Sequence, residues 1–482
     1  MPFPCVEVVA RPGISDEQRR APEVRLTKKH VQARARKLPV LRFEDQRLTS
    51  YSGMVLFQAL FQRLDLKGRM LRSLGCARGT AYGLHLLFLQ LLVHLLAGFR
   101  RLRERDYYCD DPLLPSVVGV HRFADTSTLT RRLAEAGPES VIAARAELAT
   151  LVTERIAKEK LARVTLDFDG SVLTTRGRTE GSAIGYNRKR RGARSYYPLL
   201  CTVAQTGQFL DFLHRPGNVH DSNGACDFMV DCFAAVRNVV PASKLETRVD
   251  SAFFDIKILD RLDEQHVEFS VSVPFERFPE LKGIIEKIVF YRWIAIDDQW
   301  SYAEISWRPK CWDKSHRLLV LRQRIAQPIK GPLQLDLFAP RDYEYDYRVI
   351  ATNKTLNADA IRLFHHGRGT QEGLIGEAKT HVQLDYVPTR KLVANQLFLT
   401  ASLMAHNLGR ELQMTTKPRI RTTSPTRAAL WNFENLGTLR HRLIQRAGRL
   451  TTPKGILTLT LSTNQAVQHD YEEYLRTIQV AA

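Results

Sequence analysis

Residues 164–171 read VTLDFDGS, and the sequence pattern changes there from helical to extended. Asp167 and Asp169 lie two positions apart, so a strand here places both carboxylates on one face. The polar positions alternate with three apolar residues, Val164, Leu166 and Phe168. Burying a carboxylate in such a strand is costly unless it is paired or binds a cation. The stretch therefore predicts a core strand whose acids have a specific role.

The residues that follow predict a mixed α/β sheet with helices on its faces. YYPLLCTVA (196–204) and FLDFLHRPG (209–217) read as two strands that the polar turn QTGQ joins in a hairpin. The pattern then predicts a helix, a strand ending in TRVDS, a second helix and a further strand, over 221–238, 247–251, 254–264 and 267–273. A hairpin followed by alternating helices and strands is typical of a mixed sheet.

Shifts in composition divide the rest of the chain. Short alternating runs separated by turn residues predict an inserted β subdomain, and helical patterns lie before and after it. Asp125 or Thr126 is expected to cap one of the earlier helices. We expect a basic leader (1–45), a helical N-terminal domain that binds DNA (46–158), a core in two parts (159–281 and 351–414), a β-rich insertion between them (282–350) and a C-terminal extension (415–482).

The net charge indicates a polyanionic partner. The 482 residues include 71 Lys and Arg against 51 Asp and Glu, which gives +20 at neutral pH. Such a surplus is typical of nucleic-acid binding and less often of binding to an anionic membrane, although it also serves solubility. The charge alone does not distinguish a protein that cleaves its partner from one that coats it.

Other classes of protein are disfavoured. The seven cysteines are scattered and form no CxxC pair, so a zinc ribbon or a disulfide scaffold is not supported. The apolar run over 81–99 is interrupted by Gly83, His85, Gln90 and His94, which favours a buried helix over a membrane span. The first residues do not resemble a secretory signal. We expect a soluble cytoplasmic protein.

Two further acids join the first strand as candidates for chemistry. Asp250 ends a predicted strand and Glu372 lies on a helix after the insertion. Carboxylates that converge from two adjacent strands and a helix would bind two Mg²⁺ ions and support phosphoryl transfer. Each acid alone fits an ordinary strand-end or surface carboxylate better. Their joint placement in this order of elements favours the metal site.

Basic residues surround Glu372 at helical spacing. His365, Arg368, Glu372 and Lys379 are separated by three, four and seven residues, so one helix would place all four on one face. An acid among three donors suits a metal ligand beside DNA phosphates. A solvated face with an Arg368–Glu372 ion pair fits the spacing equally well.

These residues resemble a known family. The chain is similar to bacterial insertion-sequence transposases with an RNase H-like core and an Asp–Asp–Glu triad, in the group with a Tyr–x2–Arg–x3–Glu–x6–Lys signature and a β-rich insertion. Here the signature starts at His365 where the family usually has Tyr, and the spacing through Lys379 is intact. DGS points to Asp169 as the first acid, with Asp167 as the fallback, and VDSAFF points to Asp250.

The resemblance implies Mg²⁺-dependent cut-and-paste transposition, with Mn²⁺ as a substitute metal. It implies the catalytic and metal-binding residues Asp169, Asp250 and Glu372, phosphate contacts from the signature residues, and a homodimer that holds two element ends. Members often form a DNA hairpin with a flipped base stacked on an aromatic of the insertion. Four tryptophans are candidates, although most are expected in the core: Trp293, Trp300, Trp307 and Trp312.

A basic run precedes the hairpin. RGRTEGSAIGYNRKRRGAR (176–194) combines glycines with closely spaced cations, which favours a DNA contact over a solvated loop. The expected contacts are Arg188, Lys189, Arg190, Arg191 and Arg194. Arg248, which lies close to Asp250, fits either a phosphate contact or an ion pair.

Two alternative functions remain on the sequence alone. One is an RNase H-like Mg²⁺ nuclease without strand transfer, and the other is a non-catalytic DNA-binding protein derived from a transposase. The second would need a broken triad, whereas all three acids are present.

Overall fold

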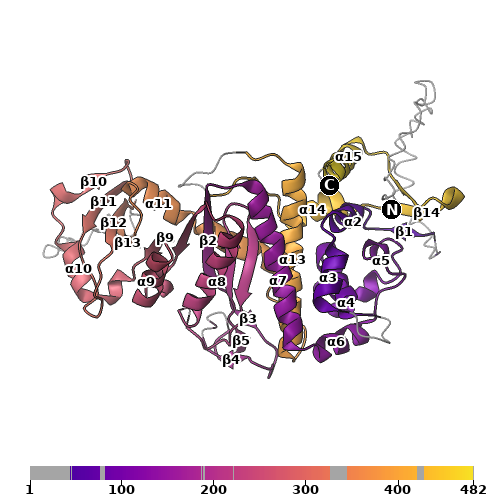
Figure 1. Ribbon diagram of the computed structural model, residues 1–482, viewed down its shortest axis with the longest axis horizontal. Helices are drawn as coiled ribbons and strands as arrows, with labels where there is room; N and C mark the ends of the chain where they lie inside the picture. Colours follow the sequence, from indigo (N-terminus) through magenta and orange to yellow (C-terminus); the bar gives the residue numbers. More distant parts are fainter. Residues whose placement is uncertain are drawn as a thin grey trace, which may run out of the picture.

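A nine-stranded mixed sheet forms the centre of the computed structural model (Figure 1). The structure describes residues 44, 46–75, 82–185, 187, 190–220, 222–325, 345–420 and 428–480. The strand order is β10-β11-β12-β13-β9-β8-β2-β6-β7. The five core strands are β2 (Arg163–Gly170), β6 (Leu199–Val203), β7 (Gln208–Leu213), β8 (Lys244–Val249) and β9 (Glu268–Ser272).

The core strands have the RNase H-like arrangement. β6 and β7 form an antiparallel hairpin beside β2, whereas β8 is parallel to β2 and β9 is parallel to β8. The fold class, the hairpin and the alternation of helix and strand are therefore as the sequence predicts. The flanking helices are α7 (Pro138–Glu159), α8 (Ala225–Val239), α9 (Ile256–Glu264), α11 (Ala358–His366), α12 (Gly369–His381) and α13 (Leu392–Thr416).

The alternation along β2 separates its two faces. Phe168 packs against Phe228 and Phe233 of α8, with ring centroids 6.0 and 5.8 Å apart. The intervening Asp167 is directed to the other face, which α11 and α12 cover. The apolar face therefore anchors β2 in the core. The acids of β2 lie on the opposite face, which α12 with Glu372 covers.

The insertion extends the central sheet. β10 (Ile294–Ala295), β11 (Trp300–Ile305), β12 (Arg317–Arg324) and β13 (Tyr345–Thr352) continue the sheet beyond β9, after α10 (Pro279–Glu286). The strands of the β-rich region are thus continuous with the core sheet, because β13 pairs antiparallel with β9. Figure 1 shows these strands at one end of an elongated molecule.

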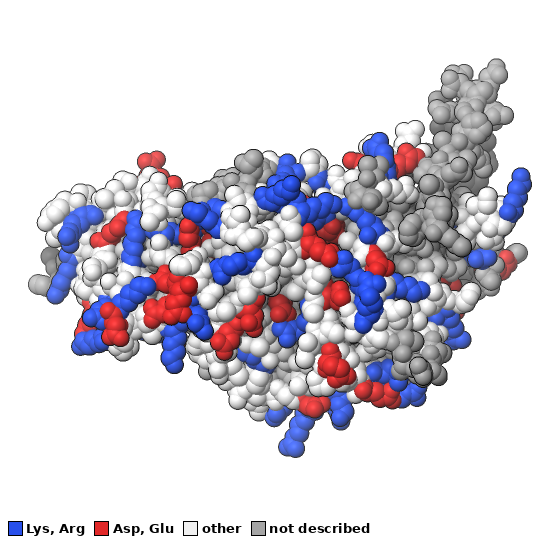
Figure 2. Space-filling model, viewed as in Figure 1, with Lys and Arg blue, Asp and Glu red and all other residues white. Residues whose placement is uncertain are grey.

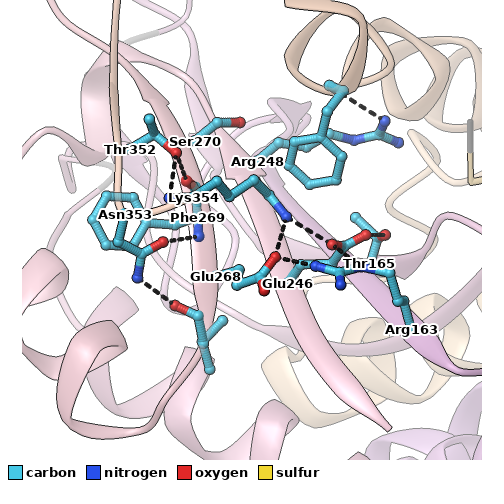
Figure 3. Close-up of polar contacts among 12 residues, drawn as sticks. Arg163, Thr165, Glu246, Arg248, Glu268, Phe269, Ser270, Thr352, Asn353 and Lys354 are labelled. Atoms are coloured by element: carbon cyan, nitrogen blue, oxygen red, sulfur yellow. Dashed lines mark hydrogen bonds and ion pairs between the residues drawn. The ribbon is translucent and has the colours of Figure 1, made fainter. Parts of the chain in front are cut away.

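A buried ionic cluster fixes the insertion to the core (Figure 3). The Lys354 ammonium lies directly after β13 and donates to Glu246 at 2.7 Å and to Glu268 at 2.6 Å. Arg163 donates to Glu246 at 2.8 Å. Arg163 and Glu268 start β2 and β9, Glu246 lies in β8, and Lys354 follows β13. The cluster therefore joins four strands at the end of the sheet opposite Asp169 and Asp250.

The helices that follow Leu48 and the segment from Leu436 to Ile478 share one core at the other end of the molecule (Figure 1). β1 (Leu48–Thr49) pairs with β14 (Gly448–Thr451), which pairs with β15 (Thr458–Leu461). The helices here are α2 (Met54–Arg63), α3 (Leu66–Leu74), α4 (Leu84–Ala97), α5 (Leu114–Val117), α6 (Thr126–Glu135), α14 (Leu436–Leu439) and α15 (Gln465–Val480).

Two expectations for this region agree with the structure. Asp125 caps α6, because its carboxylate accepts a hydrogen bond from the Thr128 amide at 2.6 Å. The apolar run over 81–99 forms the buried helix α4. Among the described residues, none of the helices combines the length and the apolar character that a membrane crossing requires.

Candidate active site

Three of the predicted acids line one cleft at the carboxyl ends of β2 and β8. The cleft has a volume of about 1100 Å³, and Asp169, Asp250 and Glu372 all contribute to it. Asp167 of β2 is the register partner of Arg248 of β8, and Asp169 and Asp250 lie two residues further along the parallel strands. Neighbouring strands are about 4.8 Å apart. The register therefore brings these two acids side by side.

Asp250 and Glu372 enter the cleft from different elements. Asp250 directly follows β8 and caps the short turn Ser251–Phe253, where its Oδ1 accepts a hydrogen bond from the Ala252 amide at 2.9 Å. Glu372 lies in the first turn of α12, with 62% of its side chain exposed. Its Oε1 is 3.5 Å from Nη1 of Arg368. The ion pair expected from the spacing is therefore present, and Glu372 still faces the cleft.

Asp167 has a structural environment instead. Its carboxylate accepts two hydrogen bonds from Arg248, each 2.8 Å long, and both side chains are buried. Burial raises the pKa of the Asp167 carboxyl, and the Arg248 guanidinium acts in the opposite direction. Asp167 does not line the cleft whereas Asp169 does. This geometry favours Asp169 as the first acid, and it makes Arg248 an ion-pair partner of Asp167.

The signature residues lie on two consecutive helices, so the expectation of one continuous face is corrected. α11 ends at His366 and α12 begins at Gly369. The Arg368 amide bonds to the carbonyl of His365, and the Phe364 carbonyl accepts from Arg248 at 3.0 Å. A Cβ on Gly367 would lie 1.8 Å from Nη1 of Arg248. Glycine at this break, which has no side chain, therefore leaves room for the buried guanidinium of Arg248.

The predicted phosphate contact of His365 is corrected by the structure, because the side chain lies in the protein interior. Its side chain is buried, and its ring nitrogens lie 2.9 and 2.8 Å from the hydroxyls of Ser270 and Ser272 on β9. Burial lowers the pKa of His365 to about 3, and nearby Arg368 acts in the same direction. The neutral ring joins α11 to the sheet. Lys379, by contrast, lines the cleft beside Glu372.

The chemistry of the acids fits a divalent cation. Mg²⁺ prefers carboxylate oxygens, and Asp169, Asp250 and Glu372 supply them in one cleft. Within the described residues, however, His, Cys, Asp and Glu form no group of three at ligand spacing. Glu372 is exposed, so packing does not fix the direction of its side chain.

The basic run is partly ordered by a small sheet. β3 (Leu173–Thr174), β5 (Arg194–Tyr196) and β4 (Ala183–Ile184) pair in that order. Arg190 lines the cleft, and Arg191 is exposed. Arg194 donates to the Ser182 hydroxyl at 3.2 Å, so its guanidinium stabilises this sheet and a DNA contact is disfavoured. Arg188 and Lys189 lie outside the described residues.

The candidate tryptophans of the insertion all have packing roles. Trp300 and Trp312 are buried. Trp307 packs on Phe278, with ring centroids 5.0 Å apart, and Trp293 lies under the Arg322 guanidinium at 4.2 Å. Among the described residues of the insertion, Phe290 and Tyr291 are the exposed aromatics.

Several cationic residues of the cleft were not among the DNA contacts predicted from the sequence. Arg100 and Arg101 line it from the N-terminal helical region, and Arg277 lines it from the insertion side. The run FRRLRER (99–105) was the available signal for the first two. Figure 2 shows Lys and Arg distributed over the visible face with acids between them. The positive net charge of the protein therefore does not show where the active site lies. The cleft that the three acids line does.

Comparison with known families decides the class of the protein. The family model described as transposase DDE domain group 1 matches residues 31–482. The chain belongs to this family. It is therefore a transposase by class, in agreement with the resemblance seen in the sequence.

Solved transposase structures are only distantly similar to this transposase. The piggyBac transposase synaptic complex with hairpin DNA is 12% identical, with a TM-score of 0.36, and the match covers 82% of this chain and 80% of that one. The Mos1 transposase paired-end complex with the left transposon end is 12% identical, with a TM-score of 0.18 and coverage of 50% and 65%. A search of curated proteins finds no match.

Proposed function

We propose that this transposase performs Mg²⁺-dependent cut-and-paste transposition of a bacterial insertion sequence. It would cleave the element ends by hydrolysis and then transfer the freed 3′-hydroxyl to target DNA. The observation that carries the proposal is that Asp169, Asp250 and Glu372 line one cleft from β2, β8 and α12. We further propose a homodimer that holds both terminal inverted repeats, acting in the cytoplasm at the nucleoid.

The three acids would hold two Mg²⁺ ions, or Mn²⁺ in their place. When bound, such ions activate water or a 3′-hydroxyl and stabilise the leaving oxygen. Asp169 and Asp250 would form the fixed part of the site, because parallel strands hold them side by side. Glu372 would complete it from α12.

The remaining signature residues would orient the DNA. Lys379 lines the cleft on the same helix as Glu372, and Arg190 lines it from the basic run. Arg368 lies directly before α12, and its side chain is 24% exposed. These donors would hold backbone phosphates, which position a strand without reading its sequence.

Replacing either of two acids tests the assignment. Asp250→Asn and Glu372→Gln should lower the rate of Mg²⁺-dependent cleavage by about four orders of magnitude or more, as loss of a member of a catalytic unit does. The substrate is a labelled duplex from each end of the DNA segment that carries the gene. Binding of these duplexes with Ca²⁺ in place of Mg²⁺ should change little.

The control and the second readout separate the alternatives. Glu286→Gln changes an exposed acid on α10 and should cleave normally. Cleavage that persists in both acid variants would refute the triad. If the unaltered protein cleaves but never joins the 3′-end to a target plasmid, the protein is a nuclease. Binding without any cleavage would indicate a non-catalytic derivative.

A further inference from the structure

The active-site cleft has a second wall, to which both the N-terminal helical region and the core contribute. Arg100 and Arg101 lie between α4 and the short helix Leu102–Tyr107. Arg176 follows β3, and Tyr386 lies between α12 and α13. All four line the same cleft as the three acids. We call these four residues the arginine wall.

The backbone of the arginine wall is fixed in place. The Glu104 carboxylate accepts hydrogen bonds from the amides of Arg100 and Arg101 at 2.7 and 3.0 Å. The Arg100 guanidinium donates to Gln383 at 2.8 Å and pairs with Asp385 at 3.1 Å. Arg100 therefore ties the N-terminal helical region to the segment that follows α12, and this contact sets the position of Arg101.

Arg101 and Arg176 have a different environment from Arg100. Both are exposed, and neither has an ion-pair partner among the residues that the structure describes. Both are near Tyr386: burial raises the pKa of its hydroxyl, and the charges of Arg101 and Arg176 act in the opposite direction. Within the described residues, both guanidinium groups thus line the cleft outside any ion pair, although the Glu104 carboxylate is close enough to Arg101 to interact with its charge.

The charges of the cleft indicate a polyanion. Its lining has six cationic side chains, Arg100, Arg101, Arg176, Arg190, Arg277 and Lys379, against four carboxylates, Asp169, Asp250, Glu372 and Asp385. Three of these acids are the proposed ligands of divalent cations, which would neutralise them, and Asp385 already pairs with Arg100. The remaining cations suit phosphates, which a guanidinium binds through two parallel hydrogen bonds.

We propose that Arg101 and Arg176 bind backbone phosphates of the DNA strand across the cleft from Asp169, Asp250 and Glu372. Arg100 is a positioning residue that holds Arg101 in the wall. The inference rests on the proposed function because it takes DNA as the substrate. It makes the N-terminal helical region a direct part of the reaction site, in addition to any role in recognising the element ends.

The salt dependence of DNA binding tests the contacts without relying on catalysis. The probe is a fluorescent duplex of random sequence with Ca²⁺ present, and log Kd is measured against log salt. Each lost phosphate contact should reduce the slope by about 0.9. Arg101→Gln and Arg176→Gln should each show this loss, and the double variant should show about 1.8. Lysine at either position should restore the slope, because it keeps the charge.

Arg103→Gln is the matched control. Arg103 is exposed on the short helix that follows Arg101 but does not line the cleft, so the Arg103→Gln variant should keep the slope of the unaltered protein. An unchanged slope in the double variant, or an equal loss in Arg103→Gln, would overturn the proposal. Melting temperatures equal to that of the unaltered protein show that all variants fold.

Cleavage of the end duplexes separates this proposal from the proposed function. If the acids prove essential but Arg101→Gln and Arg176→Gln keep the normal slope, the triad stands and the arginine wall is wrong. If the slopes fall as expected but even the unaltered protein does not cleave the duplexes, the arginine wall binds DNA and the proposed reaction is wrong.

Discussion

Asp167 and Asp169 show how two residues with the same chemistry acquire different roles. They lie on the same strand and face, yet Asp167 is held by two hydrogen bonds from buried Arg248, whereas Asp169 lines the cleft. The strand ends next to Asp169, so only this acid reaches the open space at the edge of the sheet. The position along the strand thus separates a structural acid from a candidate metal ligand.

Asparagine at each position should separate these roles. Asp167→Asn leaves the Arg248 charge buried without its counter-ion and should lower the free energy of unfolding by about 3–5 kcal/mol. Asp169→Asn should leave stability nearly unchanged and abolish cleavage. Urea denaturation and the cleavage assay measure the two effects. Equal activity of the two variants would contradict the choice of Asp169.

At the scale of elements, the break between α11 and α12 connects the signature to the core. In a continuous helix the Phe364 carbonyl would accept from the Arg368 amide, whereas here it accepts from the Gly367 amide at 3.2 Å and from the Arg248 guanidinium at 3.0 Å. His365 at the end of α11 is held by two serines of β9, so the start of α12 is positioned against the sheet. Glu372 therefore lies over β2 and β8 because of contacts made before α12 begins.

Gly367→Ala tests this connection. The added methyl group would overlap Arg248, so the variant should lose about 1–3 kcal/mol of stability, as overpacked cores do. The matched control is Gly373→Ala within α12, where a Cβ meets no atom within 4 Å. It should gain up to about 1 kcal/mol, because alanine favours a helix over glycine. Thermal or urea unfolding of the pair measures the difference, and similar stabilities would refute the packing argument.

At the scale of the whole molecule, buried histidines link stability to pH. Burial lowers the pKa of His365 and His406 to about 3, and of His94 and His214 to about 4. They lie in α11, α13 and α4 and directly after β7, so both the sheet and the terminal core contain them. In the unfolded chain a histidine has a pKa of about 6.5. Between these values the unfolded state binds more protons than the native state.

Stability should therefore be complete above about pH 6.5 and should fall as the pH is lowered toward 4. Each histidine contributes a slope of up to about 1.4 kcal/mol per pH unit within this window. Urea unfolding at about pH 7.5 and about pH 5 measures the loss, and several kcal/mol are expected. A stability that does not change between these two values would show that the native histidines accept protons normally.

The sequence by itself determined the local elements and the candidate chemistry. Alternation predicted β2 and the turn residues predicted the β6–β7 hairpin, because these patterns follow from the fixed geometry of strands and turns. The strand and helix patterns made Asp167, Asp169, Asp250 and Glu372 candidates, and only the resemblance to a family favoured Asp169 over Asp167. Only the tertiary structure decided which acid reaches the cleft, since the partner of Asp167 is 81 residues away. It also decided that the insertion extends the core sheet and that the N-terminal region completes the cleft. Such pairings depend on contacts between distant segments, which a local pattern does not encode.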